Sequence, residues 1–263
     1  MSKIDWRFLK DEENITTDSL WITSTQRNGK FYLPRRELFK DFHTGFHGLF
    51  IPEIPYQMIK RFTKPGDKIW DCFAGGGTTN YVAEKLGRKD DVLSTDLIPT
   101  SNFITYANVL QKDPLLSYKR SKCTASINFL TELSFKLIFF HPPYHNIVRF
   151  SSMANDLSNF DTLDLFLKNI ETAVQNVVPY LQARGILILV CGNIWYQNEE
   201  IDLGVQIKEL FRKEGLKSKA HIVKDYGETK AGIFGRGYNL QYYRNLKNNT
   251  NFFYGDNIFI LQK

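Results

Sequence analysis

The sequence lacks the features that mark membrane proteins and secreted proteins. No apolar run in its 263 residues approaches the roughly 18 residues needed to cross a bilayer, and the N-terminal "MSKIDWRFLKDEEN" has no apolar signal-peptide core. The three cysteines, Cys72, Cys123 and Cys191, are widely spaced and form no C-x-x-C pair. This spacing is typical of small buried thiols in a reducing compartment, and it predicts neither disulfides nor a metal site. We therefore expect a soluble, cytoplasmic protein.

Internal repeats, low-complexity stretches and Gly/Ser-rich linkers are also missing, so nothing divides the chain into parts. With 43% hydrophobic residues, the chain can bury the core of one large domain, and we predict a single domain over residues 1–263. The formal net charge of +6 favours a polyanionic partner. Because a mild basic excess is also common in proteins that bind no nucleic acid, the charge alone leaves the partner open.

Strand and helix patterns alternate along the chain. We expect helices at residues 52–63, 75–88, 101–112, 161–182 and around 203–214. We expect strands within 64–73 and at 91–96, 137–140, 185–193, 219–224 and 257–262. This order predicts a doubly wound, mostly parallel α/β sheet of the seven-stranded type with a hairpin at its C-terminal edge. Ser158 or Asn159, in the stretch "NDLSNF" (155–160), is the expected cap of the helix at 161–182, and lining a ligand pocket is the secondary role of that stretch.

Such a sheet binds its ligands at the carboxyl ends of its strands, so the candidate ligand-binding loops are those at 71–79, 96–100 and 141–150. In "DCFAGGGTT" (71–79) the glycines let the backbone turn tightly before a helix whose N-terminus faces the ligand. Asp96 ends the next expected strand, where an acid can accept hydrogen bonds from a ribose. The loop is not a G-x-G-x-x-G loop, and no P-loop Lys-Ser/Thr is present. The pattern favours nucleoside binding over the alternative, a glycine loop that serves packing only.

The stretch "LIFFHPPYHNIVRFSS" (137–152) allows two interpretations. Pro142 and Pro143 have no N–H to donate, so they could simply end a buried strand. That interpretation leaves Tyr144 unexplained. A strand end that carries a rigid Pro-Pro and an aromatic residue could also hold a flat ring against a fixed carbonyl.

Both loops resemble motifs of one enzyme family. "DCFAGGGTT" resembles the D-P-F-x-G-[ST]-G-T-T loop of the S-adenosylmethionine-dependent amino-group DNA methyltransferases, which modify N6 of adenine or N4 of cytosine. "HPPY" (141–144) resembles their [DNS]-P-P-[YFW] catalytic motif, and residues 46–71 resemble their N-terminal cofactor segment. Together these regions cover roughly half of the chain. The resemblance implies a Rossmann-like methyltransferase fold.

The resemblance also implies a cofactor and a set of site residues. The cofactor is S-adenosylmethionine, and the implied cofactor-binding residues are Asp71, Cys72, Phe73, Ala74, Gly75, Gly77, Thr78, Asp96 and Leu97. The implied catalytic residues are His141, Pro142, Pro143 and Tyr144. The side chain of His141 and the backbone carbonyl of Pro142 would accept the two N–H groups of the base amine. Tyr144 would stack on the base after it flips out of the duplex.

Three departures from the family motifs affect this interpretation. His141 stands where the family has Asp, Asn or Ser, and only a neutral imidazole can accept a hydrogen bond, so we expect the rate to fall at low pH. The same replacement removes the usual indicator of the target base. We prefer N6 of adenine because such enzymes are abundant, with N4 of cytosine as the alternative. Cys72 replaces the family's proline, and the acid expected after the third strand is missing from residues 121–129.

Two segments are candidates for contact with double-stranded DNA. Residues 225–256 interleave aromatic, basic and amide side chains, which suits a small target-recognition insertion, and its candidate DNA contacts are Arg236, Tyr238, Tyr242 and Arg244. A surface hairpin packed on the sheet is the alternative for that segment. The basic stretch 27–43 is the second candidate, although a solvated charged face is the preferred interpretation of it. It lies within residues 1–50, the expected N-terminal segment on the cofactor and DNA side.

The possible partners of such an enzyme are a cognate restriction endonuclease in a restriction-modification system or a second copy of the chain. Other functions that the sequence leaves open are methylation of RNA, methylation of a protein glutamine, and a catalytically silent DNA-binding subunit.

Overall fold

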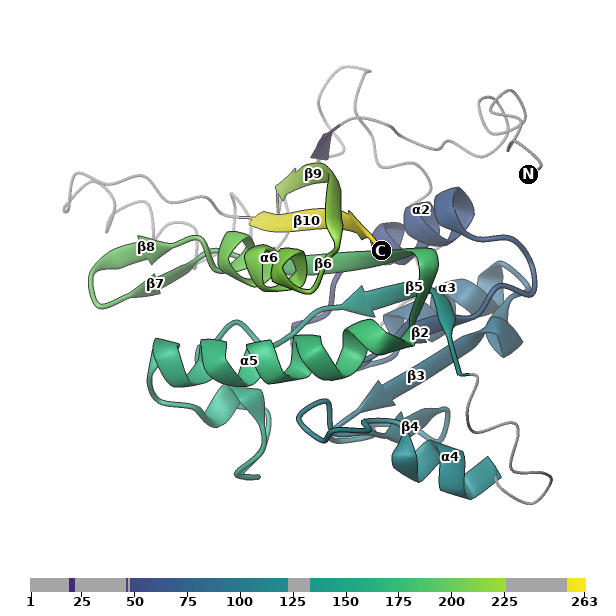
Figure 1. Cartoon of the computed structure of the whole chain (residues 1–263), viewed down its shortest axis with the longest axis horizontal. Helices are drawn as coiled ribbons and strands as arrows, with labels where there is room; N and C mark the ends of the chain where they lie inside the picture. The colour runs from purple at the N-terminus through teal and green to yellow at the C-terminus, as the bar shows by residue number, and fades with distance from the viewer. Residues whose placement is uncertain (1–18, 22–45, 47, 123–132, 226–254) are drawn as a thin grey trace.

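A computed structural model gives the fold of the chain, and it describes residues 19–21, 46, 48–122, 133–225 and 255–263 (Figure 1). The strands are β1 (Leu20–Trp21), β2 (Ile69–Asp71), β3 (Val92–Asp96), β4 (Ile104–Tyr106), β5 (Phe135–Phe140), β6 (Leu181–Gly192), β7 (Ile194–Tyr196), β8 (Glu199–Ile201), β9 (Lys217–Asp225) and β10 (Gly255–Gln262). The helices are α2 (Glu53–Phe62), α3 (Thr78–Lys85), α4 (Leu116–Lys122), α5 (Leu163–Val177) and α6 (Leu203–Lys213). Short 3₁₀ turns are η2 (Lys89–Asp91), η4 (Leu157–Asn159) and η5 (Val178–Tyr180).

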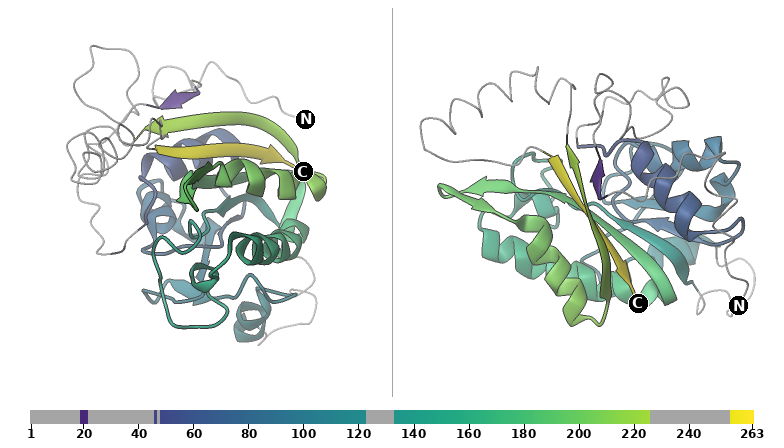
Figure 2. Two further views of the ribbon diagram at one scale, coloured as in Figure 1. Left: turned by 90° about the vertical axis from the view of Figure 1, so that its left-hand side faces the viewer. Right: turned by 90° about the horizontal axis from the view of Figure 1, so that it is seen from above.

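Eight strands form the main sheet in the order β1-β9-β10-β6-β5-β2-β3-β4. The run from β4 to β6 is parallel throughout, whereas β10 lies antiparallel between β6 and β9. The predicted doubly wound, mostly parallel sheet with an antiparallel hairpin at its C-terminal edge is therefore confirmed. Helices α2 and α3 cover one face of this sheet, and α5 and α6 cover the other (Figure 2).

The two hydrophobic cores follow from the alternation of side chains along buried strands. In β5, Leu137 and Phe139 pack with the α2 and α3 side, whereas Ile138 and Phe140 pack with the α5 and α6 side, and all four side chains are fully buried. Burial of both faces explains why this strand is a continuous apolar run. Within the described residues, no helix combines the length and apolar character that a membrane span needs.

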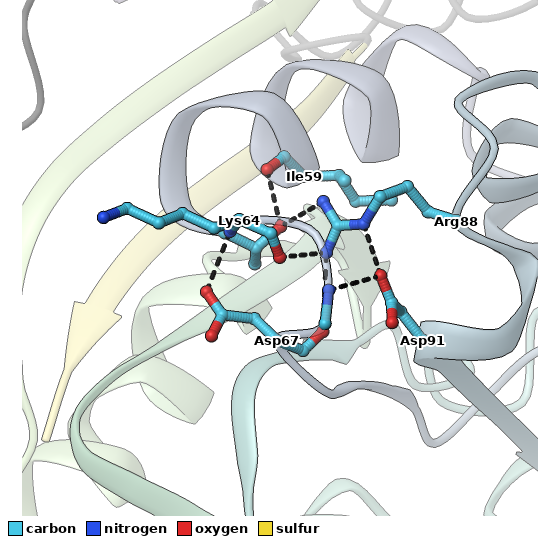
Figure 3. A network of polar contacts seen from close by, with 7 residues as sticks. Ile59, Lys64, Asp67, Arg88 and Asp91 are labelled. Atoms are coloured by element: carbon cyan, nitrogen blue, oxygen red, sulfur yellow. Dashed lines mark hydrogen bonds and ion pairs between the residues drawn. The ribbon is translucent and has the colours of Figure 1, made fainter.

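A network around Arg88 fixes the approach to β2 (Figure 3). The Arg88 side chain donates to the Asp91 carboxylate, to Thr63 Oγ1 at 3.0 Å and to the Lys64 carbonyl at 2.6 Å. The same Asp91 oxygen accepts the Gly66 N–H at 3.1 Å. These contacts connect the loop after α2 with the chain between α3 and β3. They therefore join the segment that precedes β2 to the segment that follows α3.

The expected helix at 101–112 is wrong, because the chain forms β4 there instead. Residues Ile104, Thr105 and Tyr106 pair in parallel with β3, and their β-branched and aromatic side chains suit a strand at the sheet edge. Sequence patterns also failed to predict α4, the β7–β8 hairpin and the short β1.

Both ends of the long helix α5 differ from the prediction. It ends at Val177, and Pro179 lies in the 3₁₀ turn η5 that follows, because a proline cannot continue the helical hydrogen bonds. The cap at its start is Thr162, whose side chain accepts the Leu165 N–H at 3.3 Å, so the prediction of Ser158 or Asn159 is wrong.

The division of the chain stays a prediction. Most of residues 1–50 and nearly all of 225–256 lie outside the described residues, so their predicted roles, and the single domain over 1–263, are not tested.

Candidate active site

A cavity of about 420 Å³ lies at the carboxyl ends of the parallel strands. It adjoins the ends of β2 and β5, between which the strand order reverses direction, as expected for a ligand site in a doubly wound sheet. Most of the predicted site residues line it together: Cys72, Phe73, Ala74, Gly75, Thr78, Asp96, Leu97, His141, Pro142, Pro143 and Tyr144. Asp71 and Gly77 are not among the residues that line the cavity.

The glycine loop after β2 is held in a conformation that needs glycine at position 75. Gly75 has φ +51°, and a Cβ atom there would lie 2.8 Å from Cε1 of Phe46. Its N–H donates to Asp96 Oδ2 at 2.8 Å, and Thr100 Oγ1 donates to its carbonyl at 2.6 Å. The loop is therefore fixed to the end of β3 and approaches the cavity with its backbone.

Asp71 supports this loop from behind. Its carboxylate accepts the Thr79 hydroxyl at 2.5 Å and the Phe73 N–H at 3.2 Å. Burial raises the pKa of Asp71 to about 7 because its charged form is desolvated. Gly77, at φ +84°, leads into α3, and a Cβ atom there would lie 2.7 Å from Phe103. Both residues shape the loop without lining the cavity.

The charge of the cavity wall is negative. The lining includes Asp96, Asp156 and Asp256, and among the described residues that line it there is no lysine or arginine. Burial raises the pKa of Asp96, and the nearby charge of Asp156 adds to that rise. Asp96 accepts the N–H groups of Gly75 and Ile98, and each carboxylate oxygen has further acceptor capacity. A ligand that carries positive charge and hydroxyl groups suits this wall.

Asp156 lines the cavity and lies in the stretch 155–160, but the sequence did not single it out within that stretch. It is buried and accepts the Ser151 hydroxyl at 2.7 Å and both the N–H and the hydroxyl of Ser158, at 2.8 and 2.7 Å. These bonds fold the segment after the HPPY motif against the cavity. No signal in the sequence separates this aspartate from an ordinary turn residue.

Two further polar side chains border the cavity. The Thr78 hydroxyl is fully buried and has no hydrogen-bond partner among the described residues, so other atoms of Thr78 form its part of the wall. Asn108 accepts the Leu110 N–H through Oδ1 at 2.9 Å, which leaves its amide NH₂ able to donate. Asn108 was missed because the segment after β4 was read as helix, although a polar residue just beyond a strand is the signal that would have found it.

His141 lies between two aromatic rings at the end of β5. Its ring centroid is 5.1 Å from that of Phe50 and 5.6 Å from that of Tyr144. The His141 ring borders the cavity on one side. The packing around its other sides desolvates the ring and lowers the pKa of His141 to about 4. His141 is therefore neutral at pH 7, which is the form that can accept a hydrogen bond.

Tyr144 is held from two sides. Its hydroxyl lies 3.1 Å from His141 Nε2 and donates to Asp256 Oδ1 at 2.9 Å. Its ring packs on the end of β6, where a Cβ atom at Gly192 would lie 2.9 Å from Tyr144 Cε2.

The predicted DNA contacts Arg236, Tyr238, Tyr242 and Arg244 lie outside the described residues and stay predictions.

Comparison with protein families tests the resemblance that the motifs suggested. Residues 9–109 match the family model of DNA methylases. The resemblance to the amino-group DNA methyltransferases is therefore confirmed for the part of the chain that carries the glycine loop and Asp96. The HPPY motif lies beyond the matched residues. A comparison with curated protein sequences found no significant match.

Solved methyltransferase structures are also similar to this chain. TrmN of Thermus thermophilus is 14% identical, with 82% of this chain and 50% of that chain covered and a TM-score of 0.49. NodS of Bradyrhizobium japonicum, an N-methyltransferase solved with S-adenosylhomocysteine, is 10% identical, with 75% and 78% covered and a TM-score of 0.39. A second Thermus thermophilus protein, provisionally named a DNA modification methylase, is 15% identical, with 55% and 49% covered and a TM-score of 0.33. The chain thus spans about half the length of TrmN.

Proposed function

We propose that this protein is an S-adenosylmethionine-dependent DNA methyltransferase that modifies the exocyclic amine of a flipped base, with N6 of adenine as the preferred target. One observation carries the proposal. The loop after β2, the acid at the end of β3 and the HPPY motif after β5 all line one cavity, although they are separated in the sequence. A cofactor site and an amine-holding motif in a single cavity are what methyl transfer to a base requires.

S-adenosylmethionine fits the residues that line this cavity. Its sulfonium and ammonium groups suit a wall with aspartates and no described lysine or arginine. Asp96 is the acceptor for ribose hydroxyls, and the Asn108 amide is a further hydrogen-bonding group for the same ligand. When bound, the cofactor supplies an electrophilic methyl group.

The HPPY motif is suited to the other reactant. The amine of a nucleobase is a poor nucleophile because its lone pair is delocalised into the ring, so acceptors for its N–H groups favour its attack. His141 and the Pro142 carbonyl are these acceptors, and the low pKa of His141 suits a hydrogen-bond acceptor better than a proton carrier. Tyr144 provides an aromatic surface for the flipped base, a contact that contributes about 1–3 kcal/mol in other nucleic-acid complexes.

Double-stranded DNA is the proposed substrate because the matched family acts on DNA and the net charge is +6. Residues 225–256 are the proposed contact segment. A cognate restriction endonuclease or a second copy of the chain is the proposed partner. N4 of cytosine is the alternative target, since His141 removes the motif residue that usually separates the two bases.

The test is incubation of the protein with tritiated S-adenosylmethionine and, separately, duplex DNA, RNA and protein acceptors. Nucleoside analysis of labelled DNA then separates N6-methyladenine from N4-methylcytosine. Tyr144→Ala should lose most transfer to DNA while cofactor affinity is retained, and Tyr106→Ala, an exposed tyrosine outside the cavity, is the matched control. Label in RNA or protein alone, or full activity of Tyr144→Ala, would overturn the proposal.

A further inference from the structure

A chain of hydrogen bonds runs from the C-terminal edge of the sheet to His141. Lys224 on β9 donates to Asp256 on β10, Asp256 accepts from Tyr144, and Tyr144 contacts His141. We infer that Asp256 and Lys224 are positioning residues that fix the tautomer of His141, so that its bare Nδ1 is presented to the amine of the base. This inference rests on the proposed function, and it adds two residues that neither motif contains.

Asp256 forms a buried ion pair with Lys224. Its Oδ2 lies 2.7 Å from Lys224 Nζ, and the two side chains are 6% and 2% exposed. A lysine ammonium can only donate, and a buried ammonium that lacks an opposite charge is strongly destabilising, so the carboxylate at 2.7 Å is the group that compensates it. Asp256 is therefore an ionised carboxylate, which can only accept.

The Tyr144 hydroxyl has a single proton to donate. Because Asp256 can only accept, this proton points toward Asp256 Oδ1, 2.9 Å away. The Tyr144 oxygen then has only lone pairs to offer to His141 Nε2 at 3.1 Å. Nε2 must therefore carry the imidazole proton, and in a neutral ring this leaves Nδ1 unprotonated.

The other ring nitrogen of His141 is Nδ1. Within the described residues, His141 Nδ1 makes no hydrogen bond, and it is not among the fully buried polar atoms that lack a partner. His141 lines the cavity, so Nδ1 is left available to a ligand there. An unprotonated nitrogen is an acceptor, and both N–H groups of a base amine are donors, so the polarity matches.

The sheet explains how residues so far apart in the sequence meet. Asp256 pairs with Lys224 on one side and with Gly192 of β6 on the other. Because Gly192 has no side chain, the Tyr144 ring can lie across the end of β6, and its hydroxyl reaches Asp256 from the loop after β5. Any larger residue at Gly192 would displace that ring.

Asp256→Asn is the informative substitution because it changes one acceptor oxygen into a donor with almost no change of shape. Lys224 can only donate to the side chain at position 256, so the amide oxygen faces Lys224 and the NH₂ group faces Tyr144. The Tyr144 proton must then turn toward His141 Nε2, and the imidazole proton moves to Nδ1. The nitrogen in the cavity would become a donor, which opposes the amine.

The measurement is ¹⁵N NMR of histidine-labelled protein near pH 7, where the two neutral tautomers have distinct nitrogen shifts and ring couplings. His141→Gln assigns the signal among the five histidines. We expect the Nε2–H form in the wild type and in Asp90→Asn, a matched substitution at an exposed site, and the Nδ1–H form in Asp256→Asn. A wild-type Nδ1–H form, or an unchanged tautomer in folded Asp256→Asn, overturns the inference.

Tyr144→Phe is the second variant, which serves if Asp256→Asn does not fold. It keeps the ring but removes the hydroxyl that accepts from Nε2, so an Nδ1–H fraction absent from the wild type should become detectable, and single-turnover transfer should fall at least tenfold with cofactor affinity unchanged. An unchanged tautomer in Tyr144→Phe overturns the inference. The NMR result does not depend on the reaction: a reversed tautomer in a protein that methylates no DNA would refute the proposed function alone.

Discussion

The pH dependence of methyl transfer provides a direct test of the role of His141. A histidine with an ordinary pKa of 6.5 would lose its acceptor form as the pH falls below neutrality, which is the behaviour expected from the sequence. In the structure, desolvation lowers the pKa of His141 to about 4. The charge of Lys224 acts in the same direction, and the charge of Asp256 opposes both. The loss of rate should therefore occur at a lower pH than the sequence predicts.

The size of the difference follows from the two pKa values. At pH 5.5, a pKa of 6.5 leaves about 9% of the imidazole neutral, whereas a pKa of about 4 leaves about 97% neutral. The rate constant at pH 5.5 should thus stay within a few per cent of its neutral value. An ordinary histidine would lower it about tenfold. The predicted decline begins only below about pH 5.

Single-turnover methylation with saturating cofactor and DNA, measured between pH 4.5 and 8.5, would resolve these cases. His141→Asn is the matched control, because it restores an acceptor that does not titrate. Dividing the wild-type rate by that of the variant removes the contributions of other groups, including Asp71, whose pKa is raised to about 7. Circular dichroism at each pH checks that the fold is retained. A midpoint near pH 6.5 in the ratio would refute the argument from burial.

Three further predictions concern the cofactor, the fold and the DNA. Asp96→Asn should weaken S-adenosylmethionine binding by about 1.5–3 kcal/mol in calorimetry, the usual contribution of a hydrogen bond to a charged acceptor, and unchanged affinity would remove Asp96 from the site. Arg88→Met should lower the free energy of unfolding by about 2–3 kcal/mol in denaturant titrations and leave cofactor affinity alone, since its bonds to Asp91 and to the loop after α2 are lost. Neutralising Arg236 and Arg244 together should reduce the salt dependence of DNA binding, and an unaltered slope would favour a hairpin packed on the sheet.

Much of the fold could be predicted because its signals are local. The apolar run of β5 and the glycine turn before α3 are features of single short segments, and both were found where expected. The meeting of residues 72–75, Thr78, Asp96 and 141–144 around one cavity could be predicted for a related reason. They lie at strand ends, and the topology of a parallel sheet brings those ends together without further information.

Where a segment is compatible with both a helix and a strand, its sequence alone does not determine which of the two forms. Residues 101–112 have apolar positions compatible with a helix, but pairing with β3 makes three of them a strand at the sheet edge. This error also concealed Asn108, because a residue inside a helix would not have been placed at a strand end. Tertiary pairing overrode the local pattern here.

The tautomer of His141 depends on contacts that no local pattern could predict. Asp256 is separated from Tyr144 by 112 residues in the sequence, and Lys224 is 32 residues from Asp256. Only the antiparallel register of β10 with β9 and β6 brings the three side chains into line. In the proposed function, the motif identifies which residue faces the base, and the edge of the sheet determines whether that residue donates or accepts. On that proposal, a histidine can stand where the family has Asp, Asn or Ser because a buried carboxylate paired with a lysine directs the imidazole proton away from the cavity.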